Sequence, residues 1–429
     1  MLPIIRDNDH LYPVPKFDIK KSDVKGFLNE LKGFHEQFND CFQRSESRDH
    51  FFNYMAGQFS DLERKSIEPI ALAMKNGNVR AMQRFVSDAP WDDKNIDVKY
   101  RSMVNDDIGS PNGALIFDET GFIKKGKDSI GVARQYCGTI GKVDNCQVGV
   151  FAAYASEHGY AIVDKRLFIP DKWFTDEYAK RRENCRLPED ISFQTKPELA
   201  AGMLKVISSE NILPFKYVLG DTVYGENPDF IQAAEAIPEV IYFVSIKKNT
   251  LCWLRQQLTI NHTYVRGGKT KTKTIVADTD SKPIAVSDLA KNINDYFWYR
   301  RNVSEGTKGP IVYEFTRRQI ILSGDGLPQK TVWLLIRRTL CENPEYSYFI
   351  SNALSSIRIK TLIWLSGLRW AIEQCFEETK TELGMDHYEV RKYMGWHHHI
   401  LTCIMAHFFL WHLKIRLGKK SAVHYAIAA

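Results

Sequence analysis

The chain has 429 residues, of which 44% are hydrophobic and 26% are charged. This length favours two or three structural units rather than one small core, and the composition excludes an intrinsically disordered protein. The formal net charge of +6 is mildly basic. It is compatible with a polyanionic partner such as nucleic acid but does not require one, because many enzymes carry a similar charge.

The cysteines and the apolar segments bear on the cellular compartment. The eight cysteines are dispersed, without a CxxC pair or zinc-ribbon spacing, so buried and reduced thiols in a reducing cytoplasm are expected. The N-terminal residues lack a basic region followed by an apolar one, which argues against a secretion signal. The most apolar stretch, Ile400 to Ile415, is shorter than the ~20 residues of a membrane span. It is interpreted as a buried helix, and no membrane partner is expected.

The first part of the chain has the apolar periodicity of helices. Predicted helices cover residues 27–34, 51–59 and 62–74, and Ser60 with Glu63 fits a capping box that opens the third. The segment Ser110–Gly113 is rich in turn-forming residues. Residues 1–110 are therefore assigned to a helical N-terminal domain that binds DNA.

From Ala114 onward, short apolar runs alternate with helical segments. Strands are predicted at 114–117, 148–154, 160–168, 217–219 and 241–246, and helices at 196–209 and 228–236. This order predicts a mixed α/β sheet with flanking helices. Its first part is assigned to residues 111–250.

Residues 251–348 are rich in β-type residues between turns marked by Gly and Pro. Strands are predicted at 263–276, 296–303, 311–322 and 331–338, which indicates a β-rich insertion. Within it, Arg266, Lys269, Lys271 and Lys273 alternate with Gly and Thr in a basic ribbon or loop. Such runs are usually solvated surface, but in a DNA enzyme they would follow phosphates. Residues 349–429 are helical and are assigned to the second part of the core.

Three carboxylates are candidates for chemistry. Asp118 and Asp221 each directly follow an apolar run, and an acidic residue there projects from the rim of an α/β sheet, where active sites collect. Either could equally be a helix cap or a turn former. Glu373 lies in a single helix predicted over residues 361–384, on one stripe with Arg369 and Lys380. An exposed Arg–Glu–Lys ladder would give the same pattern.

Together, the three carboxylates suit divalent metal ions. Oxygen ligands are preferred by Mg²⁺, which keeps waters and substrate phosphate oxygens in its coordination shell. Two such ions about 4 Å apart can activate a water or a 3′-hydroxyl and stabilise the leaving oxygen in phosphodiester chemistry.

Longer motifs carry a family resemblance. The segment DETGFIKKGKDSIGVARQYCGTIGKVDNCQVGVF, from Asp118 to Phe151, resembles the DDE transposases of the insertion sequence 701 family, as do RLFIPDKWFTD, FQTKPELA and GDTVYG. The late segment RWAIEQCFEETKTELGMDHYEVRKYMGWHHHI resembles the glutamate block of that family. The resemblance covers the chain from about Phe51 to Trp411.

The resemblance implies an α/β fold: an RNase H-like core, interrupted by the β-rich insertion and preceded by the helical N-terminal domain. It implies that Asp118, Asp221 and Glu373 are the catalytic residues and the ligands of two Mg²⁺ (or Mn²⁺) ions. Arg369 and Lys380 match the spacing of a Tyr–Arg–Glu–Lys signature of the wider superfamily, in which Ser366 here replaces the tyrosine. The residues expected to contact DNA are Arg369, Lys380, Lys124, Lys125, Arg134, Lys269, Lys271 and Lys273.

The implied activity is cut-and-paste DNA transposition. The protein would bind terminal inverted repeats, cleave the transposon ends and join them to target DNA, as a homodimer or higher oligomer in the prokaryotic cytoplasm, at the nucleoid. Two alternatives stay open: another RNase H-like nuclease, and a catalytically inactive DNA-binding derivative, against which the three intact carboxylates argue. His397, His398 and His399 are consecutive and point in different directions on a helix, so packing or phosphate contact is expected rather than metal binding.

Overall fold

A computed structural model of the chain describes residues 26–74, 77–267, 269–306 and 309–427. The chain divides into two compact units. Of the described residues, unit 1 comprises 217–369, and unit 2 comprises 26–216 and 370–427. The expectation about a secretion signal falls on the first 25 residues, which lie outside the described ones.

Unit 2 begins with helices that share an aromatic core with the last helix of the chain, α13 (Tyr393–Ile427). Phe34 and Phe59 both pack against Phe409 of α13, with ring centroids 5.3 and 5.7 Å away. Asn78 and Asp92 cap two of these helices by accepting hydrogen bonds from backbone N–H groups. The helices are α1 (Phe27–Glu36), α2 (Ser45–Gln58), α3 (Ile67–Ala73), α4 (Val79–Asp88) and α5 (Asp93–Ile108).

The predicted capping box at Ser60 is wrong. Helix α3 begins only at Ile67, and Ser60 Oγ donates to the Gly57 carbonyl at the end of α2, at 2.5 Å. The physical reason is Pro69. In a helix that started near residue 62, this proline would lie in the interior, where its ring and missing N–H break the helix. In α3 it is the third residue, where its N–H would have no intrahelical partner.

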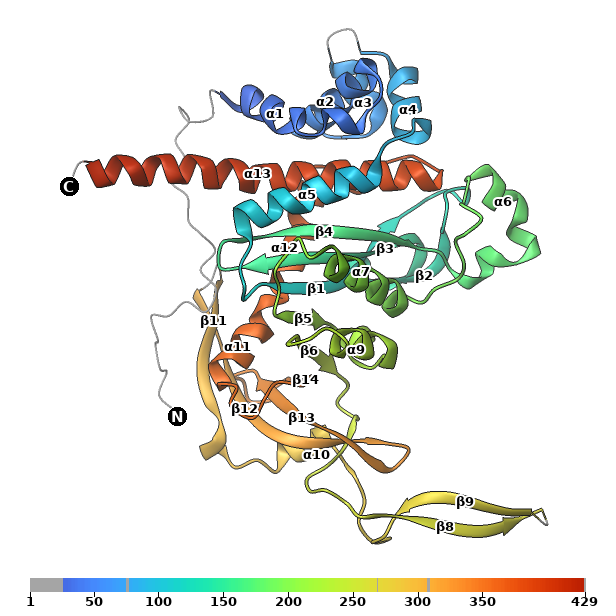
Figure 1. Ribbon diagram of the computed structural model, residues 1–429, viewed down its shortest axis with the longest axis vertical. Helices are drawn as coiled ribbons and strands as arrows, with labels where there is room; N and C mark the ends of the chain where they lie inside the picture. The colour runs from blue at the N-terminus through green and yellow to red at the C-terminus, as the bar shows by residue number, and fades with distance from the viewer. Residues whose placement is uncertain (1–25, 75–76, 268, 307–308, 428–429) are drawn as a thin grey trace. The chain divides into compact units, whose positions relative to one another are not determined.

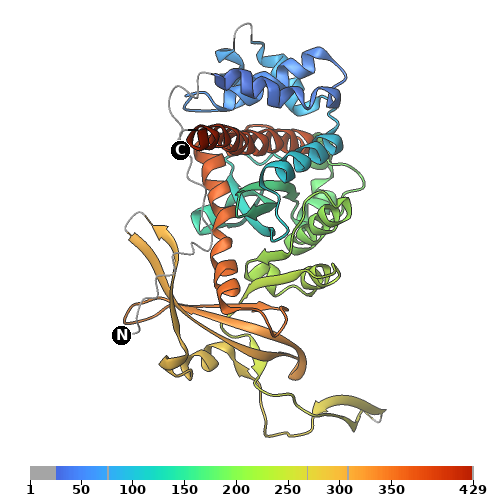
Figure 2. The ribbon, with the colours of Figure 1, turned by 60° about the vertical axis from the view of Figure 1, so that its left-hand side comes forward.

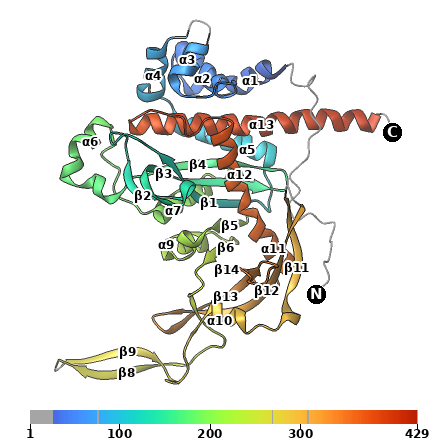
Figure 3. The same ribbon diagram turned by 180° about the vertical axis from the view of Figure 1, so that it is seen from behind.

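The centre of unit 2 is an antiparallel sheet built around β3 (Lys142–Ser156). This strand pairs with β1 (Ala114–Ile123), β2 (Ala133–Cys137) and β4 (Gly159–Phe168). Helices α5 and α7 (Lys196–Glu210) pack on one face, and α12 (Trp370–Thr381) packs on the other, as opposite views show (Figures 1 and 3). A capping box of Thr195 and Glu198 begins α7. The short helix α6 (Ala179–Asn184) precedes it.

Helix α13 lies between the N-terminal helices and this sheet (Figure 2). The stretch from Ile400 to Ile415, predicted to be a buried helix, is buried at all but three positions. Among the described residues, α13 is the one helix with the length and hydropathy of a membrane span, and 72% of its most apolar window is buried inside the protein. The apolar residues of α13 thus form part of the core of unit 2.

Unit 1 opens with two parallel strands, β5 (Tyr217–Gly220) and β6 (Ile241–Ile246), joined through α8 (Thr222–Gly225) and α9 (Pro228–Glu235). From β6 the sheet continues with antiparallel strands in the order β14, β13, β12, β7, β10, and β11 also pairs with β12. Their bounds are β7 (Leu251–Trp253), β10 (Ile284–Ala285), β11 (Tyr299–Gly306), β12 (Gly309–Gly324), β13 (Leu327–Arg338) and β14 (Tyr346–Ser351). Unit 1 also contains a separate two-stranded sheet, β8 (Thr259–Arg266) with β9 (Lys269–Val276), and helices α10 (Val286–Lys291) and α11 (Ile359–Leu368).

The predicted α/β fold class is confirmed. Along the chain, three long strands are followed by helix, strand, helix and strand, as expected for an RNase H-like core, and residues 251–348 consist mainly of strands. The division into four domains stays a prediction. The compact units divide the chain elsewhere, since residue 110 lies inside unit 2 and residues 251 and 348 lie inside unit 1.

Candidate active site

Asp118 lies in the middle of β1 and not at its end, so its predicted position at the rim of the sheet is wrong. The strand continues to Ile123, and every residue from 114 to 123 pairs with β3. The pairing continues because the residues after Asp118 include good β-formers, among them Thr120 and the buried Phe122. Asp118 itself is half-buried.

The alternation of β1 determines which way Asp118 points. Successive side chains of a strand point to opposite faces of the sheet. Glu119 forms an ion pair with Lys196 of α7 at 2.8 Å, whereas Thr120 accepts a hydrogen bond from Lys380 of α12 at 2.7 Å. Asp118 therefore shares with Thr120 the face that α12 covers.

Glu373 lies on the helix that covers this face. It is an exposed residue in the first turn of α12. One turn later, Phe376 packs edge-on against Phe151, with ring centroids 5.2 Å apart, and Phe151 is the residue of β3 that pairs with Asp118. This ring contact therefore joins β3, beside Asp118 of β1, to α12, the helix that carries Glu373.

Lys380 ties the other end of α12 to β1. Its ammonium donates to Thr120 Oγ1 at 2.7 Å, to the Gly121 carbonyl at 3.0 Å and to Thr139 Oγ1 at 3.2 Å. Burial lowers the pKa of Lys380. These three acceptors fix the rotation of α12 on the strand. The DNA contact predicted for Lys380 stays a prediction.

Asp221 belongs to unit 1, where it directly follows β5, as predicted. It is the N-cap of α8, and its Oδ1 accepts a hydrogen bond from the Val223 N–H at 2.8 Å. The alternative expectation from the sequence, that Asp221 is a helix cap, therefore describes its local structure.

Arg369 lies at the turn between α11 and α12, so the single helix predicted over residues 361–384 is wrong. Gly367 weakens the helix just before this turn, because glycine has a low helix propensity. A Cβ at Gly367 would lie 2.8 Å from Val303 Cγ1, so the glycine lets α11 approach β11. Only Glu373 and Lys380 of the predicted stripe share one helix.

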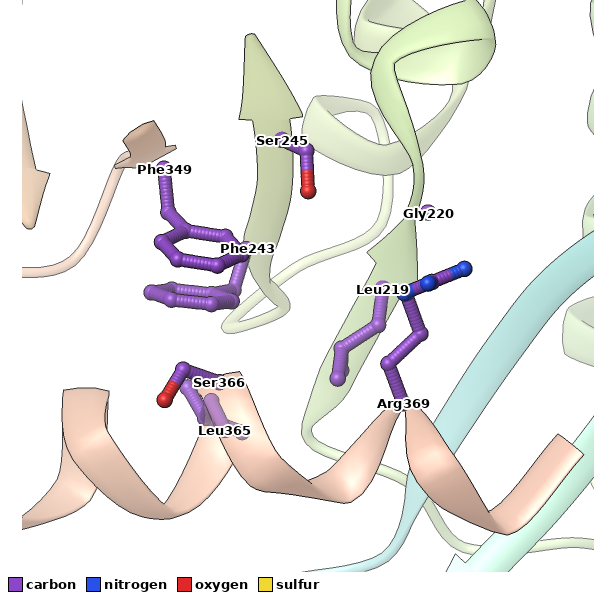
Figure 4. A pocket seen from close by; sticks show the side chains of 8 residues that line it. All are labelled: Leu219, Gly220, Phe243, Ser245, Phe349, Leu365, Ser366 and Arg369. Atoms are coloured by element: carbon purple, nitrogen blue, oxygen red, sulfur yellow. The ribbon is translucent and has the colours of Figure 1, made fainter. Parts of the chain in front are cut away.

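Arg369 lines a small pocket in unit 1. It extends from the end of α11 toward Gly220, the residue before Asp221 (Figure 4). The other walls are the stacked rings of Phe243 and Phe349 and four further residues, Leu219, Ser245, Leu365 and Ser366. A guanidinium beside the carboxyl end of β5 is suited to a phosphate, which it can bind through two parallel hydrogen bonds.

No three His, Cys, Asp or Glu side chains within the described residues form a group placed to hold a metal ion. Asp118 and Glu373 belong to unit 2, and Asp221 belongs to unit 1. The catalytic triad is therefore a prediction from the motifs and not an observed cluster. Its three carboxylates are the donors that Mg²⁺ and Mn²⁺ prefer, so the residues fit the expected ions in chemical type.

The basic residues of the first motif differ in exposure. Lys125 and Arg134 are exposed. Lys124 is half-buried: its ammonium donates to the Tyr388 carbonyl at 2.9 Å and lies 3.3 Å from the centre of the Tyr388 ring. Burial lowers the pKa of Lys124 to about 7. The other basic residues of the predicted DNA set, Lys269, Lys271 and Lys273, are exposed on β9.

The consecutive histidines of α13 pack inside unit 2. His398 stacks on Trp91, with ring centroids 3.8 Å apart, and His399 is hydrogen-bonded to Tyr54 and to the Met385 carbonyl. All eight cysteines are free thiols, and seven are buried as expected. Cys341 is the exception, since it is exposed.

Little in the sequence signals a polar cluster that lies around Glu378 on the same helix as Glu373. Glu378 of α12 accepts hydrogen bonds from Gln374 at 2.9 Å and from Tyr160 at 3.1 Å, and lies 2.6 Å from His407 Nε2. These hydrogen bonds lower the pKa of Glu378, although its burial alone would raise it. The cluster ties α12 to β4 and α13, five residues after Glu373. Only the spacing of Gln374 and Glu378, one helical turn apart, is visible in the sequence.

Comparisons with known proteins point in one direction. A family model described as DDE superfamily endonuclease matches residues 37–310. A protein of Microchaete diplosiphon, described as a probable transposase for insertion sequence element IS701, is 26% identical over 344 residues, which are 80% of this chain and 77% of that protein.

Among solved structures, the chain is similar to the piggyBac transposase in a synaptic complex with hairpin DNA. The TM-score is 0.40 and the identity 9%, over 92% of this chain and 76% of that chain. It is also similar to the NurA nuclease from Sulfolobus solfataricus, with a TM-score of 0.29 and 10% identity, over 69% of this chain and 87% of that chain.

Proposed function

Because the chain belongs to the DDE superfamily of endonucleases, we propose that it is a metal-dependent DNA transposase. It binds the terminal inverted repeats of a transposon, cleaves the ends and joins them to target DNA. The resemblance read from its motifs is confirmed by the family match and by the relative associated with insertion sequence element IS701.

One structural observation carries the proposal. Asp118 points to the face of the unit 2 sheet that α12 covers, and Glu373 is an exposed residue in the first turn of α12. The family match contains Asp118 and Asp221 and ends before Glu373. The assignment of Glu373 therefore depends on the late motif and on this helix–strand contact.

Asp118, Asp221 and Glu373 would hold two Mg²⁺ or Mn²⁺ ions. Bound ions of this kind supply Lewis-acid activation of a water or 3′-hydroxyl and stabilise the leaving oxygen. The protein's own residues place the ligands. Lys380 and Glu378 fix α12 on the sheet, and Asp221 is held at the end of β5 by its hydrogen bond to Val223. Arg369, beside Gly220, would contact a phosphate of the bound DNA.

The test of the chemistry is Glu373→Gln, which keeps the shape of the side chain and removes its charge. Loss of one such ligand commonly costs several kcal/mol of transition-state stabilisation, so end cleavage should fall by roughly a thousandfold or more. The matched control is Glu377→Gln, an exposed glutamate one turn later on α12, which should leave cleavage unchanged. The measurement is cleavage of labelled DNA from the flanks of the coding region, in Mg²⁺, Mn²⁺ or chelator.

The outcomes separate this proposal from its competitors. Near wild-type cleavage by Glu373→Gln, or full activity in chelator, would mean that the assigned chemistry is wrong. Cleavage without joining of the new 3′-ends to a second DNA would indicate a nuclease rather than a transposase. DNA binding with no metal-dependent cleavage by the wild-type chain would indicate an inactive DNA-binding derivative.

We further propose that the active complex contains at least two copies of the chain on two DNA ends, because excision requires both ends to be cut. It would act in the prokaryotic cytoplasm, where the DNA is. Light scattering of the protein with end DNA should give a paired complex, and a fully active complex of one chain on one end would contradict this. The N-terminal helices, which precede the core, would contribute to the recognition of the ends.

A further inference from the structure

The hairpin of β8 and β9 is a two-stranded sheet of its own within unit 1. Its turn contains Gly267, whose φ of 61° suits a residue without a side chain. All sixteen residues of the two strands are paired; thirteen are exposed, three are half-buried and none is buried. An isolated two-stranded hairpin is at best marginally stable in water. Because this hairpin buries none of its residues, a contribution to the hydrophobic core does not explain its presence.

The register of the hairpin places all its cationic side chains on one face. Paired residues point to the same side, and successive pairs alternate between sides. One face carries the pairs Ile260–Ile275, His262–Lys273, Tyr264–Lys271 and Arg266–Lys269. The other face carries Thr259–Val276, Asn261–Thr274, Thr263–Thr272 and Val265–Thr270. The ribbon therefore has a basic face and a neutral face.

This separation has an energetic cost in the free protein. Arg266 and Lys269 lie directly opposite one another, and like charges in that position destabilise a hairpin. The sequence from Thr259 to Val276 contains no Asp or Glu to neutralise them. A polyanion that binds to this face would remove the repulsion.

Building on the proposed function, we propose that the basic face of the β8–β9 ribbon binds the phosphate backbone of duplex DNA without regard to its sequence. Alternate residues of a strand are about 6.6 to 6.8 Å apart, so Lys269, Lys271 and Lys273 form an evenly spaced row of cations. The width of the major groove admits a two-stranded ribbon. Phosphate contacts position a protein on the duplex but do not distinguish one base from another. The ribbon therefore binds transposon, flanking and target DNA equally.

The test compares two variants of strand β9. The neutral variant is Lys269→Gln with Lys271→Gln and Lys273→Gln. The face-swapped variant exchanges Lys269 with Thr270, Lys271 with Thr272, and Lys273 with Thr274, which keeps composition and net charge and moves the lysines to the neutral face. Binding to a random-sequence duplex is measured by fluorescence anisotropy in chelator, between about 50 and 200 mM salt.

Each lysine that contacts a phosphate contributes about 0.9 to the slope of log affinity against log salt. The neutral variant should therefore lose about 2.7 of the slope on random DNA. The face-swapped variant should behave like the neutral one, because its lysines no longer lie beside Arg266 and Tyr264. Thermal unfolding midpoints equal to wild type would verify that neither variant disturbs the fold.

The outcomes distinguish this inference from the function on which it rests. A wild-type chain that binds no DNA in chelator would overturn both. If the wild-type chain binds DNA and the neutral variant has the same slope of log affinity against log salt, the ribbon does not contact phosphates. That result would overturn this inference and leave the transposase proposal intact. A face-swapped variant with the affinity and salt slope of wild type would show that the net charge of the ribbon matters and the face does not. That result would also overturn the inference. A loss confined to end sequences would show base readout, which also contradicts the inference.

Discussion

Lys380 can either hold α12 in place or bind DNA, and the two roles predict different measurements. Its ammonium has three acceptors inside unit 2, on Thr120, Gly121 and Thr139. Lys380→Met keeps the aliphatic stem and leaves these acceptors without their donor. The free energy of unfolding in urea should fall by about 1–3 kcal/mol.

The control for Lys380 is Lys205→Met on the exposed surface of α7, which should change the free energy of unfolding by less than about 0.5 kcal/mol. DNA binding by the same variants is measured against salt. The other outcome is a Lys380→Met variant with the stability of wild type, whose slope of log DNA affinity against log salt is smaller by about one. It would show that the lysine contacts a phosphate instead.

Single residues could be predicted where a motif marks them and not where a distant partner decides their role. Asp118, Asp221 and Glu373 stand in long motifs, so the sequence alone identifies them as candidates. The surroundings of Lys124 were not predictable, because its partner Tyr388 lies 264 residues later in the chain. The same holds for Glu378, which is bonded to Tyr160 across 218 residues.

At the scale of elements, the strands and helices with clear periodicity were predicted well, but several of their ends were not. The strand predicted at 241–246 is the exception, since it matches β6 at both ends. The strand that carries Asp118 is longer than predicted, because its second half is stabilised by pairing with β3. The break between α11 and α12 depends on the approach of Gly367 to Val303 of β11, which no local pattern reveals.

The turn after β5 gives a prediction at this scale. Gly225 ends α8, and a Cβ there would lie 2.1 Å from the Ser245 carbonyl oxygen and 3.1 Å from the Val244 side chain on β6. Gly225→Ala must therefore push α8 away from the parallel strand. Overpacking of this kind typically costs about 1–3 kcal/mol. The free energy of unfolding should fall by that amount, and cleavage should fall with it because Asp221 caps the same helix.

Gly202→Ala is the control for this substitution. Gly202 lies inside α7, and its Cβ would meet nothing within 4 Å, so alanine should stabilise the helix by about 0.5–1 kcal/mol. Equal stability of the Gly225→Ala and wild-type chains would contradict the close packing of α8 on β6.

At the scale of the whole molecule, local patterns predict elements but not which segments share a core. The chain leaves unit 2 after Lys216 and returns to it at Trp370. The N-terminal helices pack on α13, more than 300 residues later, as the contacts of Phe34 and Tyr54 with it show. Deleting these helices would expose buried residues of α13. End recognition is therefore better tested by substitutions on their exposed surfaces.

Buried histidines make unit 2 sensitive to acid. His399 of α13 accepts a hydrogen bond from the Tyr54 hydroxyl at Nδ1, at 2.7 Å, and donates from Nε2 to the Met385 carbonyl at 3.1 Å, so it is held neutral. Burial lowers its pKa to about 3. Burial also lowers the pKa of His397 and of His35.

The sign of the effect follows from linkage. The unfolded chain binds a proton at His399 below about pH 6.5, and the folded chain does not until about pH 3. The stability from neutral His399 is therefore complete above pH 6.5 and is lost as the pH falls, by about 1.4 kcal/mol per pH unit. Between about pH 7.5 and pH 5, this one residue should account for a loss of about 2 kcal/mol.

His399→Asn should be less stable than wild type at neutral pH, where it lacks one hydrogen bond, but its stability should fall less steeply with acid. Substituting the exposed His158 by Asn should leave the wild-type pH dependence unchanged. The measurement is urea unfolding followed by tryptophan fluorescence at several pH values. Parallel pH profiles of the wild-type and His399→Asn chains would show that the acid sensitivity has another source.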